Sequence, residues 1–101
     1  MEIKVGDYVK HFKRETDNSG TMHCYKVLAL NVIHTETKEK LAIYQAMYDD
    51  GIIYARPMDM FFSKRDKLKY PNYSQEYRLE VIRDKNLIDK IKDFESRLGS
   101  N

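Results

Sequence analysis

The sequence predicts a mainly β fold: a small antiparallel SH3-like barrel of about five strands, followed by a C-terminal amphipathic α-helix. Short apolar segments alternate with turn-rich connections through residues 1–83. The dipeptide Asp50-Gly51 lies between two such segments and has the composition of a tight hairpin turn. Apolar residues then recur at helical spacing over about 86–98. We therefore expect a single domain over residues 1–101, in which barrel closure removes the edges of the sheet.

Composition and charge set limits on the class of protein. The chain has 101 residues, the length of one domain, and its hydrophobic share of 42% is that of a folded protein. The formal net charge is +2, with lysines and carboxylates interspersed, which disfavours a dedicated nucleic-acid binder. The single cysteine, Cys24, excludes an intramolecular disulfide and a cysteine-based metal cluster. Its place in a strand-like run predicts a buried thiol.

No segment has the pattern of a membrane protein. The first residues contain no apolar leader segment, and no run approaches the roughly 18 apolar residues of a membrane span. We expect a cytoplasmic protein with no membrane partner.

Alternation and turn residues place the first three strands. The first spans residues 2–12 and bends at Gly6-Asp7, and a turn-rich loop over 13–23 follows it. The second strand covers 24–33, which is rich in β-branched and aromatic residues. The third covers 41–48 and is apolar on both faces. Both faces should therefore be covered, by barrel closure together with the helix or by a partner.

Two more strands and the helix complete the prediction. Residues 52–62 form the fourth strand, which must end, bulge or lie at an edge at Pro57, because proline has no N–H to donate. A surface loop over 63–75 leads to a short fifth strand at 76–83. Asn86 is the expected N-cap of the helix, and Gly99 follows its end. The apolar stripe of the helix consists of Leu87, Ile88, Ile91, Phe94 and Leu98.

The sequence carries no catalytic or cofactor-binding signature. It has no glycine-rich phosphate loop, no H-E-x-x-H motif, no paired cysteines and no serine in a nucleophile elbow. We therefore assign no catalytic residue, no metal ligand and no cofactor. The missing motifs lower the expectation of an enzyme without excluding one.

The connection HTET at 34–37 allows two interpretations. His34 and Glu36 are two residues apart, so an extended backbone places both on one face, where they could serve a metal or a proton relay. A metal would need at least a third ligand from elsewhere in the chain. The alternative is a hairpin turn in which Thr35 and Thr37 bond the turn backbone. Composition and spacing favour the turn.

Arginine and tyrosine residues supply further candidates for a binding site. Arg56 follows an apolar segment, where an arginine either pairs with a carboxylate or holds the carboxylate or phosphate of a ligand. Tyr44, Tyr48 and Tyr54 fall on adjacent predicted strands. Their apolar rings with polar tips suit both a barrel wall and a binding groove.

A nucleic-acid surface is a second possibility. The segment KRDKLKYPNY at 64–73 combines basic residues with tyrosines, as a stacking surface for single-stranded nucleic acid would. A solvated loop over packed tyrosines is the simpler interpretation. The residues that would contact nucleic acid are His11, Lys13, Arg14, Lys64, Arg65 and Lys67.

Four segments in one order resemble a known family. DYVKHFK, YKVLAL, HTETKEKLAIYQAMY and ARPMDMF look like the motifs of domain-of-unknown-function family 1653, a small bacterial group, over about residues 6–62. The resemblance implies a compact β-rich fold and supplies no reaction. It implies that the HTET motif, His11, Tyr44, Tyr48, Arg56 and Pro57 belong together. Such a set fits either a shared pocket or a buried polar network.

This chain departs from the family pattern at several places. The segment 14–24 is longer than the short turn of the family, and ALNVI at 29–33 carries one extra residue, which predicts a bulge. Tyr54 stands where the family commonly has tryptophan, and the C-terminal helix lies outside the match.

The leading hypothesis is a non-catalytic binding module for a small anionic ligand or a peptide. Its groove would be lined by His34, Glu36, Tyr44, Tyr48 and Arg56. A nucleic-acid-binding barrel is the alternative, and a small enzyme that uses His34 and Glu36 as acid and base is the third hypothesis. The protein would act as a monomer or a homodimer.

Overall fold

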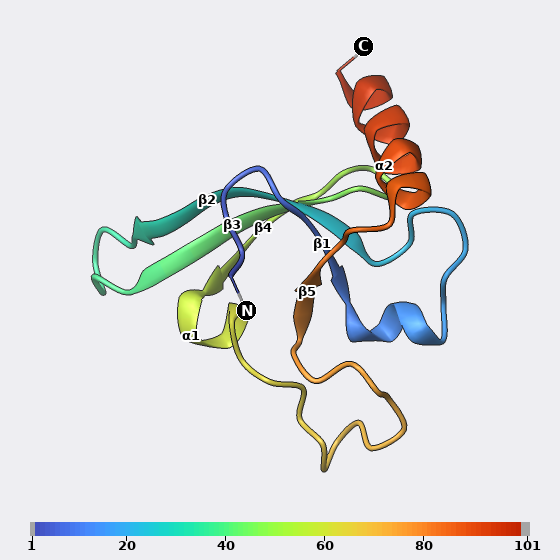
Figure 1. Ribbon diagram of the computed structural model, residues 1–101. Coiled ribbons are helices and arrows are strands. Elements are labelled where there is room, and N and C mark those ends of the chain that lie inside the picture. The colour runs from blue at the N-terminus through green and yellow to red at the C-terminus, as the bar shows by residue number, and fades with distance from the viewer. Residues whose placement is uncertain (1, 100–101) are drawn as a thin grey trace.

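The computed structural model describes residues 2–99, which form a five-stranded antiparallel sheet with a C-terminal helix (Figure 1). The elements in chain order are β1 (Tyr8–His11), the 3-10 helix η1 (Phe12–Glu15), β2 (Cys24–Ile33), β3 (Lys40–Ala46), β4 (Ile53–Pro57), α1 (Met58–Phe61), β5 (Leu79–Val81) and α2 (Lys85–Leu98). The mainly β class and the C-terminal helix are confirmed. The first, fourth and fifth strands are shorter than predicted.

The sheet is open, with the strand order β4-β3-β2-β1-β5. The predicted closure into an SH3-like barrel is therefore wrong: β4 and β5 are the two edges. β4 ends at Pro57, which has no N–H for a further ladder bond, and the chain leaves the sheet there because α1 begins at the next residue. The opposite edge, β5, has only three residues. The sequence predicts that the strand ends, bulges or lies at an edge at Pro57; β4 does end there, and it is an edge strand.

A bulge in β2 shifts its register with β3. Val27 pairs with Tyr44 and Ala29 with Ile43, and the pairing shifts both between these two positions and beyond Ala29. Asn31 has a φ of 58°, a left-handed conformation that asparagine tolerates better than most residues. The extra residue predicted in 29–33 is thus absorbed as a bulge.

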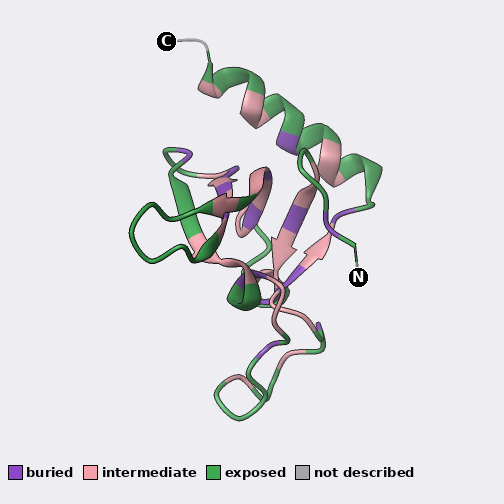
Figure 2. Ribbon diagram, turned by 90° about the vertical axis from the view of Figure 1, so that its left-hand side faces the viewer, coloured by how far each residue is buried: buried purple, intermediate pink, exposed green. Residues whose placement is uncertain are grey.

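Apolar side chains gather on both faces of the sheet. One face buries a cluster that includes Val27, Tyr44 and Phe61, and α1 lies on this side (Figure 1). The opposite face buries Cys24 and Met47 beneath α2. Figure 2 shows that α2 is exposed along most of its length and buried where it meets the rest of the protein. Within residues 41–48, Ala42 and Tyr44 are buried in the cluster with Phe61, and Met47 is buried in the cluster under α2. Leu41 and Ile43 on the second face are only half-buried, so the predicted coverage of both faces is partial.

An apolar stripe and a polar contact hold α2 to the sheet. All five residues of the predicted stripe pack in the cluster with Cys24, and burial raises the pKa of this thiol. Glu95 accepts hydrogen bonds from the Tyr8 hydroxyl and the Lys26 ammonium. Burial and this carboxylate raise the pKa of Tyr8 to about 12. No helix within residues 2–99 has the length and apolarity needed to cross a membrane.

Gly99 follows the end of α2 at Leu98, as predicted, but the predicted N-cap is wrong. The N-cap is Asp84 rather than Asn86, because Asp84 Oδ1 accepts the N–H of Asn86 at 3.0 Å. At the other end Leu98 covers Gly51, where an added Cβ would lie 2.8 Å from the Leu98 side chain. In the β3–β4 turn, Gly51 of the predicted Asp50-Gly51 pair has a positive φ (67°), and the other positive φ is at Asp49 (49°) rather than at Asp50.

We expect Ile91→Ala to destabilise the fold by about 2–5 kcal/mol, because truncation of this side chain leaves a cavity between α2 and the sheet. Ile91 is 0% exposed there. Leu68→Ala is the control: Leu68 is 97% exposed, so the free energy of unfolding should change by less than about 0.5 kcal/mol. Urea denaturation followed by circular dichroism measures both. Equal effects of the two substitutions would contradict the docking of α2.

Candidate functional site

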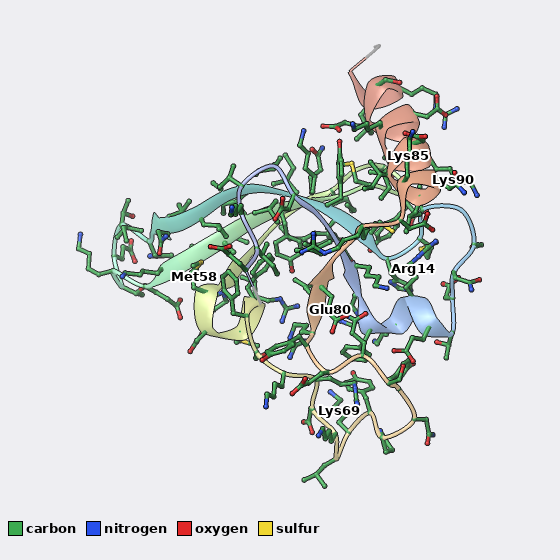
Figure 3. All side chains as sticks on the ribbon, in the orientation of Figure 1. Arg14, Met58, Lys69, Glu80, Lys85 and Lys90 are labelled. Atoms are coloured by element: carbon green, nitrogen blue, oxygen red, sulfur yellow. The ribbon has the colours of Figure 1, made fainter. Side chains whose placement is uncertain are left out.

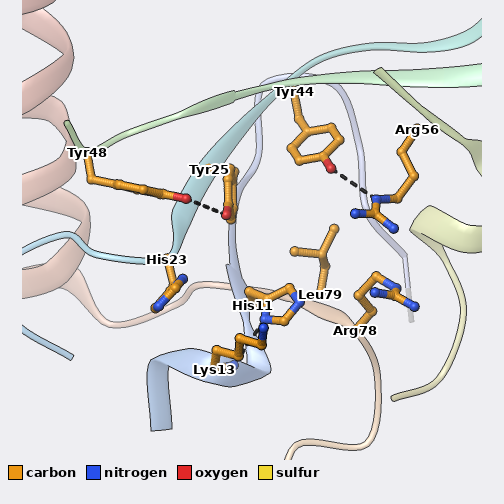
Figure 4. A pocket seen from close by; sticks show the side chains of 9 residues that line it. All are labelled: His11, Lys13, His23, Tyr25, Tyr44, Tyr48, Arg56, Arg78 and Leu79. Atoms are coloured by element: carbon orange, nitrogen blue, oxygen red, sulfur yellow. Dashed lines mark hydrogen bonds between the residues drawn. The ribbon is translucent and has the colours of Figure 1, made fainter. Parts of the chain in front are cut away.

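The face of the sheet that carries Tyr44 contains a cavity of about 190 Å³ (Figure 4). Side chains from all five strands or their immediate neighbours reach it. The lining residues are His11, Lys13, His23, Tyr25, Tyr44, Tyr48, Arg56, Arg78 and Leu79. Three of these side chains are permanent cations, and none is a carboxylate.

Arg56 reaches the cavity because of the register between β3 and β4. Tyr44 pairs with Tyr54 in this ladder, so Arg56, two residues further along β4, faces the same side. Arg56 Nε donates a hydrogen bond to Tyr44 Oη at 3.1 Å. This bond orients the guanidinium group, whose terminal nitrogens extend beyond Tyr44 in Figure 4.

Arg78 comes from the segment that leads into the opposite edge of the sheet. Its N–H donates to the carbonyl of Ser63 at 2.9 Å, and its carbonyl accepts the N–H of Phe12 at 3.3 Å. Arg78 Nε also lies 3.4 Å from Ser63 Oγ. Arg56 and Arg78 reach the same side of the cavity in Figure 4. Like charges in a shared half-buried site repel, so this arrangement favours an anion between them.

His11 is a neutral hydrogen-bond donor among these cations. Its Nδ1 accepts the backbone N–H of Lys13 at 3.1 Å, which caps η1. Burial lowers the pKa of His11 to about 3, and the charges of Arg78, His23, Lys13 and Arg56 act in the same direction. Because Nδ1 is the acceptor, the proton of the neutral ring resides on Nε2.

Another part of the cavity wall is aromatic. The hydroxyl oxygens of Tyr25 and Tyr48 are 2.6 Å apart and share a hydrogen bond (Figure 4). Burial raises the pKa of both phenols, so both keep their protons at neutral pH. The ring of His23 lies 6.0 Å from that of Tyr48, and its Nε2 lies 3.4 Å from the carboxylate of Asp17.

The charge of the cavity suits an anion rather than a metal cation. Lys13, Arg56 and Arg78 would repel a cation and attract the oxygens of a carboxylate, phosphate or sulfate group. Within residues 2–99, no group of three or more His, Cys, Asp or Glu side chains is placed to hold a metal ion.

The structure brings together three of the five residues predicted to bind a ligand. Tyr44, Tyr48 and Arg56 line the cavity. His34 and Glu36 lie in the exposed connection between β2 and β3 and are not among the lining residues. The predicted set therefore does not form one site.

The HTET connection is a hairpin turn, as its composition predicts. His34 Nδ1 accepts the backbone N–H groups of Glu36 and Thr37 at 3.2 and 3.3 Å. The His34 carbonyl accepts the N–H of Lys38, and Thr37 Oγ1 accepts the N–H of Glu39. His34 and Glu36 thus lie in an exposed turn, and neither side chain lines the cavity.

Most of the basic residues predicted to contact nucleic acid have structural partners. Arg14 and the buried Arg65 donate to backbone carbonyls within their own loops. Lys64 forms an ion pair with Glu76 at 3.2 Å. Lys67 is exposed.

These basic residues come from two parts of the fold. His11 and Lys13 line the cavity, whereas residues 64–67 belong to the long segment between α1 and β5. Figure 3 shows Arg14 and Lys69, one from each region, on separate parts of the molecule. The two regions meet at Tyr70, whose ring centroid lies 5.2 Å from Lys13 Nζ and 5.5 Å from Lys69 Nζ.

Four cavity residues are missing from the sequence-based prediction: His23, Tyr25, Arg78 and Leu79. Tyr25 could have been predicted from the sequence, because it shares a strand face with Val27, and strand pairing brings that face next to Tyr44. Arg78 alternates with apolar residues, a pattern that equally predicts a solvated side chain. His23 lies just before β2, and no pattern in the sequence predicts that it lines a cavity.

The sequence comparisons place the chain in a family. The family model described as Protein of unknown function (DUF1653) matches residues 7–80. The chain belongs to the DUF1653 family. The match to DUF1653 extends well beyond the resemblance at 6–62, includes every residue that lines the cavity and ends before α2. No curated protein matches this DUF1653 chain. No solved structure matches it.

We expect the stability of this DUF1653 protein to fall as the pH drops below about 6.5. An unfolded histidine binds a proton near pH 6.5, whereas folded His11 resists protonation down to a pKa of about 3. Acid therefore favours the unfolded state. The slope is at most about 1.4 kcal/mol per pH unit, and solvent screening reduces it because His11 is only partly buried.

The variant His11→Asn isolates this effect. Asparagine retains an acceptor for the N–H of Lys13 but does not titrate. Urea denaturation at pH 6.5 and pH 5, above the range in which most carboxylates titrate, should show a smaller loss of stability for the variant. Equal losses for variant and wild type would contradict the lowered pKa of His11.

Proposed function

We propose that this DUF1653 protein is a non-catalytic binding module for a small anionic ligand, with the cavity beside Tyr44 as its site. One observation carries the proposal: Arg56 and Arg78 line a single cavity whose lining also includes Lys13 and contains no carboxylate. Lys13 Nζ lies 5.2 Å from the centroid of the neighbouring Tyr70 ring. The expectation of a cytoplasmic, bacterial protein remains part of the proposal.

The hydrogen bonding of the arginines supports this role. Arg65 illustrates a structural arginine: it is buried, and two carbonyls, those of Gln75 and Tyr70, accept its N–H groups. Arg56 and Arg78 differ, because their side-chain hydrogen bonds within residues 2–99 use Nε and a hydroxyl oxygen. Their terminal N–H groups are suited to a fork of hydrogen bonds with an oxyanion.

The volume of the cavity favours a small molecule over a peptide. About 190 Å³ is below the roughly 300–1,000 Å³ of pockets that enclose drug-sized ligands. A peptide would insert only a single side chain or its terminal carboxylate. We therefore retain the small anion from the sequence-based hypothesis, with Arg78, Lys13 and His11 in place of His34 and Glu36.

We expect Arg56→Gln or Arg78→Gln to weaken anion binding by about tenfold or more, because each removes a charge-assisted fork. Arg83→Gln is the matched control: it removes the same charge from an exposed position outside this cavity. Amide NMR titrations at low ionic strength with phosphate, sulfate, acetate and malonate measure the binding. Shifts should cluster on the residues that line the cavity.

The free energy of unfolding provides a second measurement for these variants. Arg56→Gln should destabilise the fold less than Arg65→Gln, because Arg56 has one side-chain hydrogen bond, to Tyr44 Oη, whereas the buried Arg65 donates to two backbone carbonyls. The proposal fails if none of the four anions shifts the cavity amides. It also fails if Arg56→Gln and Arg83→Gln bind these anions equally well.

A further inference from the structure

We infer that the cavity selects a tetrahedral dianion, and that its ligand is a small phosphate monoester whose phosphoryl group lies among Lys13, Arg56 and Arg78. This inference rests on the proposed anion-binding function and names the class of ligand. It is drawn from the number, type and direction of the hydrogen-bond donors around the cavity.

The cationic donors offer hydrogen bonds and accept none. An ammonium group and two guanidinium groups have only N–H donors, so Lys13, Arg56 and Arg78 match a ligand rich in acceptor oxygens. Their combined charge of +3 exceeds what a single carboxylate would balance. A phosphate monoester carries close to −2 above its second pKa near 6, and it offers three terminal oxygens.

His11 adds a neutral donor whose direction is fixed. Its Nδ1 is occupied by the backbone N–H of Lys13, so Nε2 carries the proton. The ring cannot turn over without loss of this cap on η1. Its stacking against Phe12, with ring centroids 4.2 Å apart, holds it further. The Nε2–H group can therefore serve as one more preorganised contact for an oxyanion.

The tyrosine hydroxyl groups supply further hydrogen-bond donors. Tyr44 Oη accepts the bond from Arg56, which leaves its own O–H to donate. Tyr25 and Tyr48 share one hydrogen bond but have two hydroxyl protons, so one proton remains for a ligand whichever of them is the donor. A ligand with ammonium or amide donors would find no carboxylate among the lining residues to accept them.

The donors come from separate parts of the fold, which favours a tetrahedral group over a planar one. His11 ends β1, Lys13 belongs to η1, Arg56 lies on β4, and Arg78 immediately precedes β5. A carboxylate accepts hydrogen bonds mainly in its own plane and is satisfied by a single guanidinium fork. A phosphoryl group presents three oxygens in different directions and can use donors from several sides.

The other residues that line the cavity limit the size of the group esterified to the phosphate. Tyr25, Tyr48 and His23 form an aromatic part of the wall, and Leu79 adds an apolar contact. Within about 190 Å³, a phosphoryl group leaves space for a short carbon chain and little more. The substituent we expect is of the size of glycerol, with hydroxyl groups that meet the tyrosine pair.

Four probes test the inference at constant ionic strength between pH 5 and pH 7.5, with binding measured by amide NMR shifts. Glycerol 3-phosphate is a monoester that loses its second charge near pH 6, and sulfate is a tetrahedral dianion throughout this range. Malonate is a planar dicarboxylate, and acetate is a planar monoanion. The sulfate titration accounts for any titration of the protein, because sulfate itself keeps its charge.

We expect glycerol 3-phosphate at pH 7.5 to bind at least about tenfold more tightly than acetate and malonate. Between pH 7.5 and pH 5 its affinity relative to sulfate should fall by about tenfold, because only the dianion is selected. Arg78→Lys retains the charge but loses the fork, so it should reduce the preference for sulfate over acetate, whereas Arg83→Lys should not.

Each alternative result separates the inference from the function on which it rests. If acetate or malonate binds as tightly as glycerol 3-phosphate, the cavity binds anions but the tetrahedral selectivity is wrong. If sulfate binds and glycerol 3-phosphate does not, the cavity excludes the ester group and the monoester assignment is wrong. If none of the four probes binds, the proposed anion-binding function fails together with the inference.

Discussion

Pro57 ends β4 and fixes the point at which the chain leaves the sheet for α1. Without an N–H at this position the ladder cannot continue, and the chain turns at once into α1. Phe61 at the end of α1 is fully buried, with its ring centroid 5.3 Å from that of Tyr44. This contact draws the following segment toward the Tyr44 face of the sheet. The face that a closed barrel would have filled is shared instead by an apolar cluster and a cationic cavity.

The segment between α1 and β5 is held by polar contacts that explain where Arg78 lies. Arg65 is buried and donates to two carbonyls of this segment. Glu15 of η1 accepts the backbone N–H groups of Ser74 and Gln75, and these bonds lower its pKa. Arg65 and Glu15, which the sequence alone would place in solvent, thus hold this segment in position through hydrogen bonds to its backbone. They bring Arg78 to the cavity from a position far along the chain.

Local sequence patterns predict much of the fold and little of the site. The HTET turn, the bulge in 29–33, the strand end at Pro57 and the helix stripe depend on a few neighbouring residues, and all are found. Barrel closure is wrong because it depends on whether two distant edges meet. The site prediction contains Tyr44, Tyr48 and Arg56 and lacks Arg78, because the approach of Arg78 depends on how the segment after α1 crosses the sheet.

The periodicity, the turns and the places where backbone hydrogen bonding must stop can be predicted from the sequence, because they depend on the chemistry of adjacent residues. The sequence also determined the excess of basic over acidic charge. Only the tertiary structure decided which cations face one another and which are neutralised by local partners. The physical reason is distance: electrostatic interaction and burial act through space, and His11, Arg56 and Arg78 become neighbours only when three segments meet.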